Sequence, residues 1–138
     1  MPCFVRYTEA VRHDHVLLSE VHLPKGSVIV FDRGYVDYLQ YQRFTDNDIY
    51  YVTRLKDNAV YASGEEYDIP EDSDSGILKD EEIILSYGEK NQLKHRSRRI
   101  AYWNSENKRL PVFLTNNFGL SAEQIALIYK KGTVLKSK

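Results

Sequence analysis

The chain has 138 residues, 42% hydrophobic and 28% charged, which suits one globular domain with a modest core. Its 19 Lys and Arg residues nearly cancel its 20 Asp and Glu residues, so the net charge gives no argument for a nucleic-acid partner. A single cysteine excludes an internal disulfide. Without a long apolar run or a secretory leader pattern, we expect a cytoplasmic protein with no membrane partner.

The first part of the chain alternates between strand and helix patterns. Residues 2–8 and 27–31 are rich in β-branched and aromatic side chains, which is typical of strands, and the second run follows a Pro-Lys-Gly turn. Residues 13–22 and 35–46 have apolar residues at helical spacing, and residues 49–55 form another strand pattern. This order predicts an α/β fold with a parallel or mixed sheet.

After residue 56 the helical periodicity disappears. Short strand patterns separated by turn residues occur at residues 58–62, 81–87, 98–103 and 110–115. Residues 104–108 have the composition of a hairpin loop, and residues 68–76 that of a loop or mobile tip. The pattern predicts an all-β insertion set into the α/β frame.

Helical spacing returns after residue 120. Ser121 is a favourable N-cap, and Ile125, Ala126 and Tyr129 lie on one helical stripe. We expect Gly132 to interrupt this helix after barely three turns.

The charged residues are segregated along the chain. Residues 65–82 are strongly acidic and residues 90–99 strongly basic. Such segregation fits either a local basic surface or two strands that pair acid against base.

Ordinary catalytic motifs are missing from this sequence. It contains no phosphate-binding loop, no dinucleotide fingerprint and no Ser-His-Asp spacing, and His13 and His15 are two apart, which separates them on a helix. Asp32 stands out because it follows the strand pattern of residues 27–31. It would either cap the next helix or, at the carboxyl end of a strand, serve as an oxygen ligand to a metal ion.

Five short motifs occur in order along the chain, at residues 23–27, 30–35, 51–56, 113–117 and 128–131. Together with residues 2–5 and 13–14 they resemble the DDE transposases of bacterial insertion sequences, in the family-four group with the Tyr-Arg-Glu-Lys signature. The resemblance runs from Pro2 to Lys131 and implies a partial ribonuclease-H-like fold, a mixed sheet with helices that carries an all-β insertion. We therefore expect a partial catalytic core over residues 1–56, the β-rich insertion over 57–116, the start of the core's C-terminal helix over 117–131 and a divergent tail over 132–138.

The resemblance also implies a chemistry, metal-dependent phosphoryl transfer on transposon-end DNA. In the intact family enzyme, two Mg²⁺ or Mn²⁺ ions are held by three carboxylates from different elements. Asp32 matches the second of these acids, which makes it the candidate catalytic and metal-binding residue. The first acid has no counterpart in this chain. Tyr129 matches the signature's Tyr, whereas Gly132 and Lys136 occupy the positions of its Arg and Glu.

One carboxylate cannot hold two Mg²⁺ ions, so we expect a transposase fragment, truncated at both ends, that is inactive by itself. An alternative is a non-catalytic DNA-binding or interfering protein that associates with full-length transposase. A third interpretation is an unrelated small α+β domain.

Phosphate contacts to DNA are expected from basic residues near Asp32. Arg33, Arg54 and Lys56 are the candidates, and Arg54 and Lys56, two apart on a predicted strand, should share a face. The basic residues 96–99 are explained equally well by pairing with acids.

Overall fold

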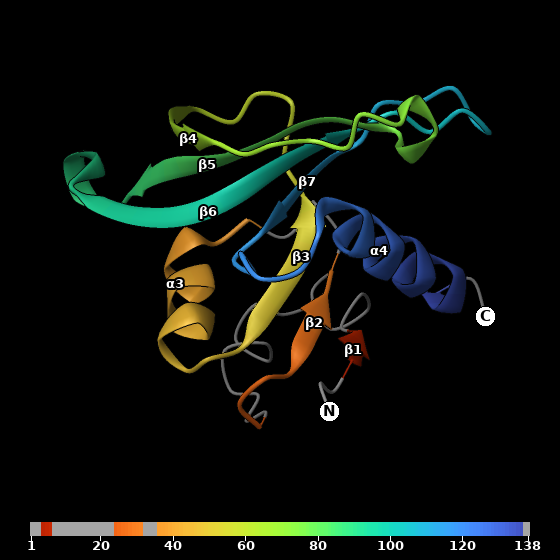
Figure 1. Ribbon diagram of the computed structural model, residues 1–138. Helices are drawn as coiled ribbons and strands as arrows, with labels where there is room; N and C mark the ends of the chain where they lie inside the picture. The colour runs from red at the N-terminus through yellow and green to blue at the C-terminus, as the bar shows by residue number, and fades with distance from the viewer. Residues whose placement is uncertain (1–3, 7–23, 32–35, 137–138) are drawn as a thin grey trace.

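The strands of the chain build one mixed sheet. The structure, a computed structural model, describes residues 4–6, 24–31 and 36–136, and within them the strand order is β1-β2-β3-β7-β6-β5-β4 (Figure 1). β1, β2 and β3 are parallel, and each later pair is antiparallel. The prediction of an α/β fold with a mixed sheet is confirmed. The bounds are β1 Phe4–Arg6, β2 Val28–Val30, β3 Tyr50–Arg54, β4 Tyr61–Glu66, β5 Ile77–Tyr87, β6 Leu93–Tyr102 and β7 Val112–Thr115.

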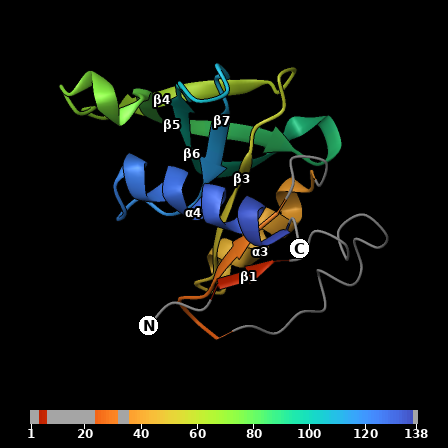
Figure 2. The same ribbon diagram turned by 90° about the vertical axis from the view of Figure 1, so that its right-hand side faces the viewer.

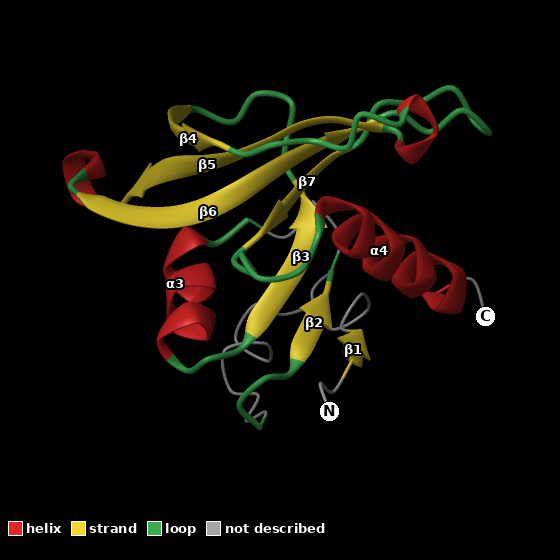
Figure 3. Cartoon of the chain, in the orientation of Figure 1, coloured by secondary structure: helices red, strands yellow, loops and turns green. Residues whose placement is uncertain are grey.

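Two α-helices cover opposite faces of this sheet, α3 (Tyr38–Asp46) and α4 (Ala122–Lys136), as the turned view shows (Figure 2). Strand alternation produces the two faces, because successive side chains point to opposite sides. Ile29 and Tyr51 pack in the cluster beneath α3, whereas Val28 and Val52 pack in the cluster beneath α4. Short 3₁₀ turns, η1 (Ser73–Ser75) and η2 (Glu89–Asn91), complete the described secondary structure (Figure 3).

Both helices begin at polar caps. The Asp37 carboxylate caps α3 by accepting a hydrogen bond from the Gln40 backbone N–H at 3.2 Å. At α4, Ser121 Oγ accepts from the Gln124 N–H at 3.1 Å and Gln124 Oε1 accepts from the Ser121 N–H at 2.9 Å, which is a capping box. The N-cap predicted at Ser121 is confirmed.

Several predicted boundaries were wrong for identifiable reasons. α4 continues through Gly132 to Lys136, because a glycine inside a helix costs only about 1 kcal/mol and keeps its backbone hydrogen bonds. β4 covers Tyr61–Glu66 rather than residues 58–62. It is an edge strand of mostly exposed residues, so its pairing with β5, not an apolar pattern, defines it. The predicted helix at residues 13–22 lies outside the described residues.

A chain of buried polar groups joins α3 to the sheet. Tyr51 Oη lies 2.7 Å from His95 Nε2 and 2.7 Å from Ser97 Oγ, and His95 Nδ1 lies 2.9 Å from Gln42 Oε1. His95 is fully buried, and this burial lowers its pKa to about 4, although the Asp46 carboxylate acts in the opposite direction. At neutral pH the imidazole is therefore neutral.

The first prediction concerns acid stability. Between pH 6.5 and about 4 the unfolded chain binds a proton at His95 that the folded chain does not bind. The free energy of unfolding therefore falls as the pH falls through this window, and the contribution of neutral His95 to stability is complete only above pH 6.5. A shift of this size corresponds to about 3 kcal/mol. Urea denaturation at pH values across the window measures the slope. His95→Gln, which cannot take up the proton, should flatten it, and equal slopes for both proteins would contradict the prediction.

Candidate functional site

The predicted site belongs to the edge of the sheet where the parallel strands β2 and β3 end. Phe31, directly after β2, is buried, and its backbone N–H donates to the Val52 carbonyl at 3.3 Å, so the pairing of the two strands continues past β2. Asp32 and Arg33 come next in the chain and lie outside the described residues. The alternative in which Asp32 caps the following helix is wrong, because Asp37 is the N-cap of α3.

Arg54 is the last residue of β3 and faces α4. Its side chain is half-buried, and its Nε is buried without a hydrogen bond to any described residue. Arg54 also lines a cleft, where a half-exposed guanidinium can bind an anionic ligand. Its contact with DNA phosphate stays a prediction.

Lys56 does not share this position. β3 ends at Arg54, and Leu55 after it is buried while Lys56 is exposed. The pairing with β7 continues past β3, because the Leu55 backbone N–H donates to the Val112 carbonyl at 2.8 Å, so a shared face for Arg54 and Lys56 stays a prediction. Lys56 is an exposed charge outside the cleft that Arg54 lines.

This cleft has a volume of about 500 Å³ and lies between α4 and the hairpin that joins β6 to β7. The sequence predicted the hairpin loop, and the backbone bonds between Asn104 and Arg109 confirm it. α4 contributes Glu123, Tyr129 and other residues to the wall. The charged residues of the lining are Arg54, Arg109 and Lys130 with Asp74, Glu106 and Glu123.

Tyr129, the residue that matches the signature's Tyr, is half-buried in this wall. Its ring lies 5.2 Å from the ring of Phe113, and both belong to the cluster beneath α4. Glu123 lies well before the signature's Glu position and is not predicted from the sequence, yet it lines the cleft with Arg54. Its helical spacing of three from Ala126, which also lines the cleft, is the pattern that could have identified it.

The basic residues 96–99 are paired with the acidic run, which confirms the pairing interpretation for these residues. Arg96 contacts Glu82 and its guanidinium carbon lies 3.8 Å from the centre of the Phe118 ring, and Arg99 Nη1 lies 3.0 Å from Glu81. The hydrogen bond from Arg96 lowers the pKa of the Glu82 carboxyl. Arg99 lies directly opposite Glu81, and Arg96 reaches Glu82 diagonally, so both pairs of opposite charges stabilise the pairing of β5 with β6.

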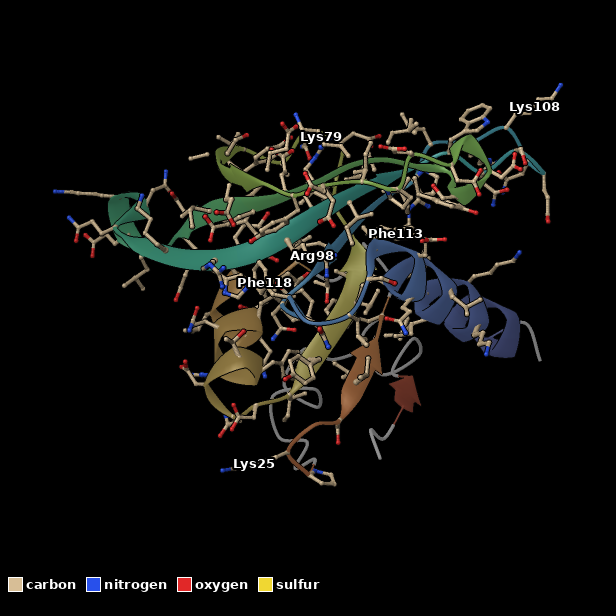
Figure 4. The ribbon with its side chains drawn as sticks, in the orientation of Figure 1. Lys25, Lys79, Arg98, Lys108, Phe113 and Phe118 are labelled. Atoms are coloured by element: carbon tan, nitrogen blue, oxygen red, sulfur yellow. The ribbon has the colours of Figure 1, made fainter. Side chains whose placement is uncertain are left out.

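Arg98 is buried and organises the start of α4. Its Nε and Nη2 donate to the two carboxylate oxygens of Asp80 at 2.8 and 2.7 Å. Its Nη1 donates to the carbonyls of Asn117 and Leu120 at 3.0 and 2.6 Å. Figure 4 shows Arg98 below β6, beside the segment that leads into α4. The Arg98 guanidinium thus fixes the loop before α4 to the sheet.

The motif at residues 113–117 also serves the framework. The Asn116 amide oxygen accepts from the Tyr51 N–H at 2.9 Å, and its amide nitrogen donates to the Ile49 carbonyl at 2.9 Å. Asn117 Oδ1 accepts from the backbone N–H groups of Gly119 and Leu120 at 2.9 and 3.0 Å. Asn116 thus ties the end of β7 to the start of β3, and Asn117 closes the loop that follows β7.

The described residues do not by themselves form a metal centre. Among residues 4–6, 24–31 and 36–136, no group of three or more His, Cys, Asp or Glu side chains is placed to hold a metal ion. In the same part of the chain, neither α-helix has the length and apolar character needed to cross a membrane.

Comparison with known proteins supplies a family. The model of the family described as "Transposase DDE domain" matches residues 1–131. No curated protein matches the chain.

The second prediction concerns the Arg98 anchor. Arg98→Met leaves the Asp80 carboxylate buried and unpaired, and should lower the free energy of unfolding by about 3–5 kcal/mol. The matched control is Arg96→Met on the same strand. That exposed pair should contribute far less to the free energy of unfolding, because solvent screens it.

Urea denaturation at pH 7 compares the two variants. Combining Arg98→Met with Asp80→Leu should recover part of the loss, because no charge then remains buried. Equal costs for Arg98→Met and Arg96→Met would show that Arg98 does not anchor the loop.

Proposed function

Because the chain belongs to the family of transposase DDE domains, we propose that it functions in DNA transposition as a DNA-binding domain that does not cleave DNA by itself. The DNA backbone lies along the edge of the sheet where β2 and β3 end, and Arg33, Arg54 and Lys56 contact its phosphates. The observation that carries this proposal is the position of half-buried Arg54, at the carboxyl end of β3 and in the wall of a cleft.

The arrangement of the strands supports this location. β2 and β3 are parallel neighbours with Val30 opposite Val52, so their carboxyl ends lie at the same edge of the sheet. Ligands of α/β sheets bind at this edge. The sequence places Asp32 and Arg33 just after β2, and Arg54 closes β3.

We propose a ribonuclease-H-like core, of the family-four group, as the framework of this site. β1 to β3 and α3 belong to residues 1–56, and α4 begins within residues 117–131. Residues 57–116 form the insertion. β7 lies in the insertion and pairs with β3, so the insertion extends the sheet of the core rather than forming a separate layer. Residues 132–138 diverge from the family in sequence.

The residues present do not fit the metal pair of the intact family enzyme. Asp32 is the proposed carboxylate ligand, but no three His, Cys, Asp or Glu side chains of the described residues are placed to hold a metal ion. Gly132 and Lys136 stand in α4 at the signature's Arg and Glu positions. A single carboxylate leaves most of the near-octahedral shell of Mg²⁺ without protein ligands. Catalysis would need acids from another polypeptide, such as a full-length transposase with which the chain associates.

The third prediction follows from this set of acids. The chain is incubated with Mg²⁺ or Mn²⁺ and with duplex DNA that carries transposon-end inverted repeats. We expect no strand cleavage on a denaturing gel. Cleavage that disappears in the Asp32→Ala variant would overturn the proposal of inactivity and would establish Asp32 as a catalytic residue.

The fourth prediction separates specific phosphate contacts from general charge. Arg54→Gln should weaken binding to a short DNA duplex and should reduce the slope of log affinity against log salt by about 0.9, as expected when one phosphate contact is removed. The control is Lys90→Gln, which removes the same charge from the exposed η2 turn.

Fluorescence anisotropy over a salt series measures both variants, and circular dichroism confirms that each is folded. Wild-type protein that shows no binding even at low salt would refute the DNA-binding proposal. Equal slopes of log affinity against log salt for Arg54→Gln and Lys90→Gln would instead show that the cleft lined by Arg54 does not contact the DNA.

A further inference from the structure

The polar chain beneath α3 contains four hydrogen-bond contacts, but its neutral side chains supply only three protons for them. Four contacts follow one another: Ser97 Oγ to the Thr115 carbonyl at 2.9 Å, Tyr51 Oη to Ser97 Oγ, His95 Nε2 to Tyr51 Oη, and His95 Nδ1 to Gln42 Oε1. Each contact needs one proton. Ser97, Tyr51 and a neutral imidazole provide one each, which leaves one contact without a proton.

The arrangement in the structure is therefore complete only with the imidazolium form of His95. Both ring nitrogens then donate, to Tyr51 Oη and to Gln42 Oε1, and the Gln42 amide nitrogen donates to Asp46 Oδ1 at 2.9 Å. Full burial of His95 opposes this charged form, in agreement with its lowered pKa.

Neutral His95 has two ways to resolve the shortage. With the proton on Nδ1, the Gln42 amide stays in place, but either Tyr51 Oη or the Thr115 carbonyl is left without its hydrogen bond from Ser97, inside the core. With the proton on Nε2, all the buried hydrogen bonds are kept if the Gln42 amide turns over and donates to Nδ1. Turning the amide breaks the exposed hydrogen bond between Gln42 and Asp46 instead.

The energetic costs of these two arrangements differ. Losing a hydrogen bond inside the core costs more than losing an exposed one, because the exposed groups can bond to water instead. The Nε2–H form with the turned amide is therefore favoured at neutral pH.

We propose that His95 and Gln42 form a proton-operated switch between the sheet and the C-terminal turn of α3. Neutral His95 carries its proton on Nε2 and accepts from the turned Gln42 amide, which leaves Asp46 unbound by Gln42. Protonation turns the amide back, so that Gln42 binds both the imidazolium and Asp46. The protonation state of His95 thereby determines whether Gln42 binds Asp46 in the last turn of α3. In the same turn Thr45 Oγ1 accepts a hydrogen bond from the Asn116 amide.

The groups that face His95 from each packed element define its surroundings. α3 contributes the Asp46 charge and the ring of Tyr41, against which Tyr38 packs, and β3 contributes Tyr51. On β5 the residue opposite His95 is Leu85, and Tyr87 is the nearest titratable side chain on that face. On its own strand, the neighbouring Lys94 and Arg96 are exposed and point to the opposite face of the sheet. Asp46 is the one acidic charge that acts on His95 among the described residues.

Nuclear magnetic resonance of the full chain tests the switch directly. Long-range ¹H–¹⁵N correlations should show the Nε2–H tautomer of His95 at neutral pH. On acidification, the Gln42 side-chain amide signals should shift with the same apparent pKa as the imidazole. The Nδ1–H tautomer at neutral pH, or a Gln42 amide that does not respond when His95 titrates, would overturn the proposal.

Variants of the half-exposed Gln42 bring the titration to milder pH. Gln42→Glu places a carboxylate beside Nδ1 and should raise the pKa of His95 by about one to three units. Gln42→Ala, which adds no charge, should not raise it, and Asp46→Asn should lower it slightly by removing the more distant acid. A Gln42→Glu protein with an unchanged His95 pKa would show that residue 42 does not face the ring.

Discussion

The buried ion pair between Arg98 and Asp80 is the interaction on which the position of α4 depends. Its guanidinium uses three nitrogens for four hydrogen bonds, two to the carboxylate and two to carbonyls of the loop before α4. A charged group as buried as Arg98, which is 5% exposed, is stable only when its hydrogen-bond donors are satisfied. The ion pair therefore needs the loop carbonyls, and the loop is held in place by the ion pair. The opposed acidic and basic runs of the sequence therefore serve the fold: they register β5 against β6 and attach α4, and they leave the basic residues 96–99 committed to protein partners.

The motifs that resemble the transposase family divide into framework and chemistry. Asn116 and Asn117 satisfy backbone groups of β3 and of the loop after β7, and the turn before β2 uses Gly26 at a φ of 87°, where a side chain would be strained. These residues stabilise the fold of this chain, and none of these contacts involves DNA chemistry. Arg54 has no such role among the described residues, and Asp32 lies outside them. Family membership therefore explains the fold more directly than it explains the activity of this chain.

The sequence predicted the parts of the fold that have a local cause. β2, β3 and α3 follow from apolar periodicity, and the start of α4 follows from the Ser121 cap. β5 and β6 are longer than predicted because their charged residues pair across strands, which no window of one strand reveals. The burial of His95 was missed for the same reason, since its partners Gln42 and Tyr51 are 53 and 44 residues away. At the site, Glu123 was missed because the cleft is formed by a hairpin and a helix that meet only in three dimensions.

The stability of α4 and its chemistry reside in different turns of the helix. Ala122, Ile125 and Ala126 are buried in the first turns and attach the helix to the sheet, together with the Arg98 anchor. The signature positions at Gly132 and Lys136 come after these residues, in turns that remain helical. Replacing a residue of such a late turn leaves the packing of the first turns undisturbed. A transposase DDE domain can therefore keep its sheet and its cleft while the residues at these late positions change. Phosphate contacts need single cations, whereas a metal pair needs several carboxylates together, so changes at the late positions affect metal binding before they affect DNA binding.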